Sequence, residues 1–160
     1  MDGPWLEAVV LYLDGDGIRH VVPRGDETVR APWDPDLDPN EVIVDAVAGL
    51  GLRPFMVHST SWRVVGQWIL LTFLVAVEPP ARIPDACEAE LVTRAELARG
   101  RAIGPAPEVH LSQVVEHGLR HLAWLAREDE AINQALAAWS RALNVYTPEP
   151  FRAFGSEPGS

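Results

Sequence analysis

Hydrophobic positions near the N-terminus fall into two short runs that predict a β-hairpin. Residues 8–13 (AVVLYL) and 18–22 (IRHVV) have strand length, and the DGDG segment between them has the composition of a tight turn. The two aspartates also resemble the start of a calcium-binding loop, but Ile18 occupies the third ligand position, which argues against calcium. Residues 23–39 are rich in Pro and Asp and predict a loop.

The next segment predicts an amphipathic helix over residues 39–50. Asp38 can cap it, Pro39 suits the first helical position, and Glu41 completes a capping box. Gly51 supplies the stop signal. The apolar residues recur at helical spacing and form one stripe that packs on the rest of the protein. They are Val42, Ile43, Ala46, Val47 and Leu50.

Three further runs predict strands. Residues 56–65 and 68–77 flank Gly66 and Gln67, which suit a turn, and residues 87–92 alternate between apolar and polar positions. The second run, WILLTFLVAV, is apolar on both faces, so we expect an interior strand that is covered on both sides. Together with the helix, these runs indicate an α/β fold.

The C-terminal part of the chain predicts helices. A capping box opens a short helix that ends at Gly100, residues 108–127 give the longest helix, and residues 131–143 give another. The chain contains no internal repeat. We expect a main domain over residues 1–127, with the last helix and a Pro/Gly-rich tail over residues 128–160 packed on it.

Charge and composition narrow the functional classes. The net charge of the 160 residues is −10, so the surface repels phosphate backbones and we expect no nucleic-acid partner. All 13 basic residues are arginine, which with abundant Ala, Gly and Pro is typical of a GC-rich bacterial genome. Cys87 is the one cysteine, which excludes an internal disulfide. No run has the length of a membrane helix and no signal-peptide pattern is present, so we expect a cytoplasmic protein without a membrane partner.

The order of these elements resembles the Nudix fold over residues 8–127. The anchor is Leu50-Gly51-Leu52, which matches the end of the Nudix signature GX5EX7REUXEEXGU, where U is aliphatic. A strand that carries Ser61, Trp62 and Arg63 follows it. The resemblance implies an α/β/α sandwich with a mixed sheet, here with an extra C-terminal helix.

The signature itself is degenerate. In the family, its glutamates bind the divalent ions that activate water against a diphosphate, and its arginine orients one of them. In this chain the signature positions carry Arg30 for the opening Gly, Asp36 for the first Glu, Val44 for Arg, Asp45 for the next Glu, and Ala48 and Gly49 for the Glu pair. Alanine and glycine offer no ligand to magnesium, which prefers hard oxygen donors. The resemblance therefore implies a helix that keeps its structural role without a metal or catalytic residues.

Three functional hypotheses follow. The first is a Nudix-like domain without hydrolase activity, which binds a nucleotide-like small molecule or another protein and needs no cofactor. The second is a divergent hydrolase of nucleoside-diphosphate-type substrates that uses Mg²⁺ and displaced carboxylates. Its candidate residues are Asp36, Glu41, Asp45, Glu88 and Glu90, with Glu108 as a further acid. The third is a structural homodimer with Trp124, Trp139 and a histidine stripe at its interface.

Several residues are candidates for ligand binding. Arg30 and the polar strand residues His58, Ser61 and Arg63 could line a cleft in the Nudix-like arrangement, although alternation on a half-exposed strand explains the last three nearly as well. The long helix carries a stripe of histidines, namely His110, His117 and His121. His110 and His117 are too far apart along the helix axis to share one metal ion, and His117 with His121 would need a third ligand from elsewhere, so a ligand- or partner-facing stripe or a plain boundary face is expected.

Two residues could act as nucleophiles, Ser112 and Cys87. Neither lies in a nucleophile-turn motif such as GXSXG, and Cys87 lies in a predicted strand. We therefore expect both to be packed or solvent-facing rather than catalytic.

Overall fold

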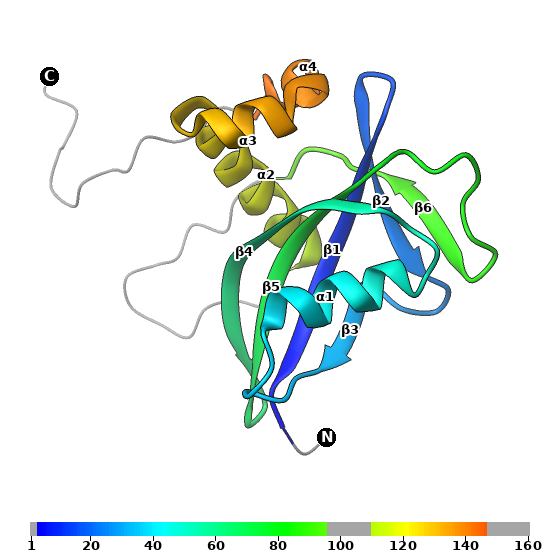
Figure 1. Cartoon of the computed structure of the whole chain (residues 1–160), viewed down its shortest axis with the longest axis vertical. Coiled ribbons are helices and arrows are strands. Elements are labelled where there is room, and N and C mark those ends of the chain that lie inside the picture. Colours follow the sequence, from blue (N-terminus) through cyan, green and yellow to red (C-terminus); the bar gives the residue numbers. More distant parts are fainter. Residues whose placement is uncertain (1–2, 96–109, 147–160) are drawn as a thin grey trace, which may run out of the picture.

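A mixed β-sheet forms the centre of the fold (Figure 1). The computed structural model describes residues 3–95 and 110–146, and the sheet in these residues has the strand order β4-β5-β1-β2-β6, with β3 paired to β1. Strands β1 and β5 run parallel, whereas the other pairs are antiparallel. The strands are β1 (Trp5–Asp14), β2 (Gly17–Pro23), β3 (Val29–Pro32), β4 (Pro54–Val65), β5 (Trp68–Val77) and β6 (Cys87–Leu91).

Two helices cover opposite faces of this sheet, α1 (Pro39–Ala48) and α2 (Leu111–Glu128) (Figure 1). Because successive side chains of a strand point to opposite faces, β1 contributes to both hydrophobic cores. Leu6 and Val10 belong to the core under α1, whereas Val9 belongs to the core under α2. The predicted α/β sandwich with a mixed sheet is therefore confirmed.

Strand β5 lies between β4 and β1, which confirms the predicted interior strand. Its second half, from Phe73 to Val77, is buried. Leu74 packs in the core under α2 and Val75 in the core under α1, so both faces of the strand are covered. A run without polar alternation is what a strand in this position requires.

Strand β3 is not predicted by the sequence, and the loop expected over residues 23–39 is wrong at Val29–Pro32. The strand has only four residues and ends in a proline, so its sequence signal is weak. Its burial alternates, with Val29 buried and Arg30 exposed. Pairing with the first half of β1 places Arg30 opposite Glu7.

The single helix predicted over residues 131–143 is also wrong. The chain forms three short pieces there, α3 (Glu130–Ala135), a 3-10 turn (Ala137–Trp139) and α4 (Ser140–Leu143). The break falls at Leu136, whose φ of −104° and ψ of 20° are not helical. Leu136 and Trp139 are both buried in the core under α2. The break lets these two side chains reach that core, and their burial favours it over a continuous helix.

Parts of the predicted C-terminal organisation lie outside the described residues. These parts are the short helix from residue 96 to Gly100, the start of the long helix at Glu108, and the tail from residue 147. Leu136, Trp139 and the residues around them share one hydrophobic cluster with α2 and the sheet. No helix in residues 3–95 and 110–146 is long and apolar enough to cross a membrane.

Asp38, Pro39 and Gly51 act at the ends of α1 as the sequence predicts, whereas the capping-box bond expected of Glu41 is not among the hydrogen bonds of the described residues. Asp38 accepts a hydrogen bond from the backbone N–H of Asn40 at 2.8 Å, and Pro39 begins the helix. After the last turn, Gly51 donates its N–H to the carbonyl of Ala48 at 2.9 Å and adopts a φ of +89°. A side chain at this φ clashes with its own backbone, so the turn that leads from α1 into β4 depends on glycine.

We expect Gly51→Ala to lower the free energy of unfolding by about 1 kcal/mol, because alanine is strained at a positive φ. Urea denaturation measures this change. Gly3→Ala is the matched control, since Gly3 does not have a positive φ and a Cβ added there meets no other atom within 4 Å. Equal losses in the two variants would show that the conformation of Gly51 is not the reason for its presence.

Candidate functional site

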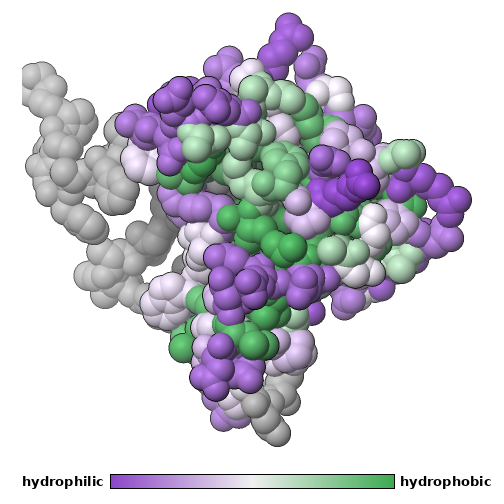
Figure 2. All heavy atoms as spheres, in the orientation of Figure 1, coloured by the Kyte–Doolittle hydropathy of each residue, from purple (hydrophilic) through white to green (hydrophobic). Residues whose placement is uncertain are grey.

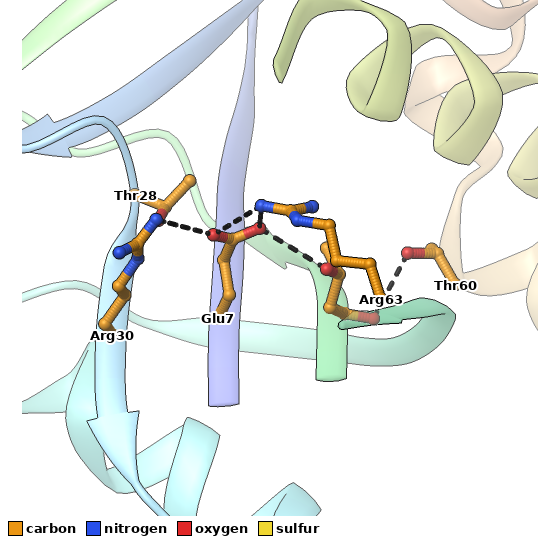
Figure 3. A network of polar contacts seen from close by, with 6 residues as sticks. Glu7, Thr28, Arg30, Thr60 and Arg63 are labelled. Carbon is orange, nitrogen blue, oxygen red and sulfur yellow. Dashed lines mark hydrogen bonds and ion pairs between the residues drawn. The ribbon is translucent and has the colours of Figure 1, made fainter. Parts of the chain in front are cut away.

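The candidate site is built around Glu7, a carboxylate that is completely buried in the sheet (Figure 3). Alternation along β1 puts its side chain on the face that α2 covers, with Val9. Thr28 donates a hydrogen bond to its Oε2 at 3.1 Å, and Thr72 donates one to its Oε1 at 3.3 Å. Two hydroxyl groups do not neutralise a buried charge, so the carboxylate requires cationic partners as well.

Two arginines from different strands supply that charge. Nη2 of Arg63, on β4, lies 2.9 Å from Oε1 and 3.1 Å from Oε2 of Glu7. Nη2 of Arg30, on β3, lies 3.4 Å from Oε2. Figure 3 shows the two side chains approaching the carboxylate from opposite sides. Both were predicted as ligand-binding residues, and the structure brings them together.

The pairing of the strands explains this convergence. Glu7 stands opposite Arg30 on β3 and opposite Thr72 on β5, and Thr72 stands opposite Ser61 on β4. These four residues form one row across the sheet, so the predicted ligand residue Ser61 lies two strands from Glu7. Arg63 lies two residues further along β4, and its long side chain reaches back to the carboxylate.

The charges of the site do not balance. One buried carboxylate faces two guanidinium groups, whose side chains remain 46% exposed in Arg30 and 30% exposed in Arg63. Within the described part of the chain, both arginines donate hydrogen bonds through Nη2 only, so other donors remain on each group. A surplus positive charge with spare N–H donors is suited to an anionic ligand.

The histidine candidates form a separate cluster. The rings of His58 and His121 are 5.0 Å apart, and His121 stacks on Trp124 at 5.9 Å. Burial lowers the pKa of His58, and the nearby charge of protonated His121 lowers it further. Burial also lowers the pKa of His121, with a smaller electrostatic contribution from His117. His110 and His117 are exposed, and His110 precedes the first residue of α2. The structure thus joins one strand histidine to one helix histidine.

His20 is a buried histidine that the sequence did not single out. It lies on β2, and its Nε2 has no hydrogen-bond partner among the described residues. Burial lowers its pKa to about 4, although the negative charge of Glu7 acts in the opposite direction. The imidazole is therefore neutral at neutral pH.

The carboxylates proposed for hydrolysis lie on different parts of the structure. Glu41 and Asp45 are exposed on α1, and Asp36 is exposed in the loop before it. Glu88 and Glu90 lie on β6, where Glu88 accepts a hydrogen bond from Arg24 at 2.9 Å. Glu90 stands opposite His20, which stands opposite Leu11 of the core under α2. Glu90 therefore lies on the sheet face opposite α1.

No three His, Cys, Asp or Glu side chains within residues 3–95 and 110–146 come close enough to hold a metal ion. Glu108 lies outside these residues.

Cys87 is buried, and its burial raises the pKa of the thiol, so it is poorly suited to act as a thiolate nucleophile. Ser112 is exposed at the start of α2.

A second buried carboxylate, Glu116 on α2, has a structural environment. It accepts hydrogen bonds from Nε of Arg94 at 2.7 Å and from Nε of Arg120 at 2.8 Å. Burial would raise its pKa, but these hydrogen bonds lower the pKa overall. Arg94 also donates to the carbonyl of Val145 and lies over the ring of Tyr146. The cluster ties the segment after α4 to α2, and no sequence pattern indicated it.

The dimer hypothesis loses one of its residues. Trp139, expected at an interface, is only 3% exposed and fills the core under α2. Trp124 is exposed on α2, beside His121. The prediction for Trp139 is wrong because a continuous helix was expected. The break at Leu136 instead turns the Trp139 side chain into the core under α2.

The most important residue that the sequence did not identify is Glu7. The strand was expected to begin at residue 8, whereas β1 begins at Trp5. The segment WLEAVV holds one charged residue within an apolar run, and such a residue is expected to have partners when it is buried. Extending the strand by three residues would have predicted a buried charge, although not which arginines pair with it.

Comparisons with known proteins identify no family. No family model matches the chain, and no curated protein matches it. A solved structure from Chromobacterium violaceum, described as a proposed member of the nudix hydrolase family, aligns with a TM-score of 0.49 and 14% sequence identity. The alignment covers 91% of this chain and 96% of that chain. Likeness at this level leaves function to be inferred from the side chains of the site.

We expect the stability of the protein to fall as the pH falls from about 6.5 to about 4, partly because of His20. The pKa of His20 is lower in the folded state than in the unfolded state, so the unfolded chain binds the proton more tightly. Protonation therefore stabilises the unfolded state in this pH range. A pKa near 4 corresponds to about 3 kcal/mol of lost stability once both states are protonated. Urea denaturation from pH 7 to pH 4 measures the slope, which should be smaller in His20→Leu. Identical slopes in the two proteins would contradict the assignment.

Proposed function

We propose that this protein is a Nudix-like binding module without hydrolase activity, and that Arg30 and Arg63 bind the phosphate groups of a nucleotide-like small molecule. The observation that carries the proposal is the pair of guanidinium groups held by one fully buried carboxylate. The pair is exposed enough to meet a ligand, while its inner nitrogens are fixed to Glu7.

Electrostatics favour the binding of a phosphate beside Arg30 and Arg63 rather than elsewhere on the surface. The chain carries a net charge of −10, so a free anion is repelled by the protein as a whole. At Glu7 itself, two cations face one anion. Arginine presents planar, paired N–H donors that match phosphate oxygens, and the bond to Glu7 holds each guanidinium group before the ligand arrives.

The position of the site favours binding without hydrolysis. The arginines meet Glu7 on the sheet face that α2 covers, whereas Asp45 lies on α1 at the opposite face. A phosphate held by Arg30 and Arg63 is therefore separated by the sheet from the one carboxylate that α1 keeps at a signature position. Ala48 and Gly49 replace the glutamate pair that would hold magnesium in a Nudix hydrolase.

The first experiment is calorimetric titration with ADP and with ADP-ribose in the absence of divalent ions. We expect saturable binding that weakens about 10- to 100-fold in Arg30→Ala, because each charge-assisted hydrogen bond contributes about 1.5–3 kcal/mol. Arg30 is preferred to Arg63 for this test, since its contact with Glu7 is longer and its loss disturbs the fold less.

Arg53→Ala is the matched control, because Arg53 is an exposed arginine near the start of β4 whose ion pair with Glu78 spans 3.8 Å. Binding should be unchanged in this variant. Equal losses in Arg30→Ala and Arg53→Ala would indicate non-specific attraction to positive charge. No binding of either compound to the unaltered protein would remove the proposal.

The second experiment tests turnover. We expect no magnesium-dependent hydrolysis of ADP-ribose, dinucleoside polyphosphates or nucleoside triphosphates above background. Without the glutamate pair, the metal that activates water and neutralises phosphate charge is held weakly, which costs several orders of magnitude in rate. Product analysis with and without Mg²⁺ measures this. Turnover that disappears in Asp45→Asn or Glu90→Gln, with the fold intact by circular dichroism, would support the displaced-carboxylate hydrolase instead.

A further inference from the structure

The two ends of the strand order differ in charge. Strand β6 forms one end and carries Glu88 and Glu90, whose charges hinder pairing with another acidic chain. Strand β4 forms the other end, and Arg63 is its only charged residue. Because Arg63 turns onto the sheet face and pairs with Glu7, it does not protect this edge.

The hairpin of β4 and β5 also exposes large apolar side chains. Trp62 is 67% exposed and Val64 is 62% exposed, and Val65 and Ile69 are about half exposed. Val64 stands opposite Ile69, and Trp62 stands opposite Leu71, so Trp62, Val64, Ile69 and Leu71 share one face of the hairpin, whereas Val65 points to the other face. In Figure 2, hydrophobic residues reach the surface at the lower end of the molecule, where this hairpin ends in Figure 1.

The pairing of β4 with β5 is regular in this part of the hairpin. A register shift occurs between Ser59 and Ser61, and from Ser61 to Val65 the pairing with β5 continues without interruption. The outer edge of this five-residue segment is not paired with any strand in the described part of the chain. An edge whose one charged side chain, Arg63, is turned toward Glu7 and whose neighbours are largely apolar is a template for a further strand.

We propose that this edge binds a second copy of the chain, with β4 of one protomer antiparallel to β4 of its partner. The proposal does not depend on the ligand-binding function above. A two-fold axis through the edge brings Trp62 and Val64 of each protomer against the same apolar face of the other, and it closes the assembly at two subunits. Pairing of β4 with β6 of another copy would instead leave free edges and form open chains.

The charge of the protein favours this contact over other contacts between copies. Each chain carries a net charge of −10, so two copies repel each other over most of their surfaces. Between Asp45 and Glu78 the sequence holds no acidic residue, and this interval contains the whole hairpin. The β4 edge is therefore the part of the sheet where two acidic protomers approach with the least repulsion.

Sedimentation equilibrium of the full chain over a range of concentrations tests the proposal. We expect a monomer–dimer equilibrium whose dissociation constant rises at least 10-fold in Trp62→Glu, because the substitution puts like charges across the two-fold axis and removes an aromatic contact. The dimer should become tighter as salt rises from roughly 0.05 to 0.5 M, since salt screens the repulsion between protomers.

Leu91→Glu is the matched control, because Leu91 is 56% exposed on the opposite edge strand, β6. It should leave the dissociation constant unchanged. Val64→Lys serves as a second disruptive variant if circular dichroism shows that Trp62→Glu is unfolded. The proposal is overturned if the unaltered protein stays monomeric at all concentrations. It is equally overturned if Leu91→Glu or Trp124→Glu dissociates the dimer while Trp62→Glu and Val64→Lys do not.

Discussion

The burial of the Glu7 carboxylate is the constraint on which the rest of this structure depends. An unpaired carboxylate inside a sheet costs several kcal/mol, so the fold is stable only if partners reach it. They come from Thr28, before β3, and from β3, β4 and β5. A one-residue slip of β3 or β5 would turn Arg30 or Thr72 to the other face of the sheet. Glu7 thus helps to specify the register of β3 and of β5 against β1.

The same interaction couples stability to the proposed binding of phosphate. Arg63 contacts both oxygens of Glu7 and is its principal counter-ion, whereas Arg30 has one longer contact and a more exposed side chain. A ligand does not have to displace Glu7, because each guanidinium group keeps donors that the carboxylate does not use. The two arginines therefore differ in role. We expect Arg63 to contribute more to stability and Arg30 to contribute more to ligand binding.

The sequence predicts the elements whose signals are local. The apolar stripe and Asp38 cap identify α1, and the unbroken apolar run identifies β5 as an interior strand, because burial on both faces leaves no room for polar alternation. Strand β3 and the break at Leu136 were missed, since both depend on packing against distant residues. Of the site, Arg30 and Arg63 were predicted through a family resemblance, but their meeting point at Glu7 follows from strand order, which no local pattern contains.

Helix α1 shows why a fold can be kept while the chemistry of one surface changes. Ile43 and Val47 are fully buried, so their replacement would open cavities that cost about 2–5 kcal/mol for a change to alanine. Asp45 and Ala48, on the outer face, are exposed, and substitutions at such positions usually change stability by less than about 0.5 kcal/mol. The outer face can thus lack carboxylates without weakening the sandwich. On the opposite face of the sheet, the arginines cannot vary so freely, because a buried carboxylate holds them. The arginines proposed to bind phosphate are consequently fixed by folding, whereas carboxylates on α1 that would hold a hydrolytic metal ion are not.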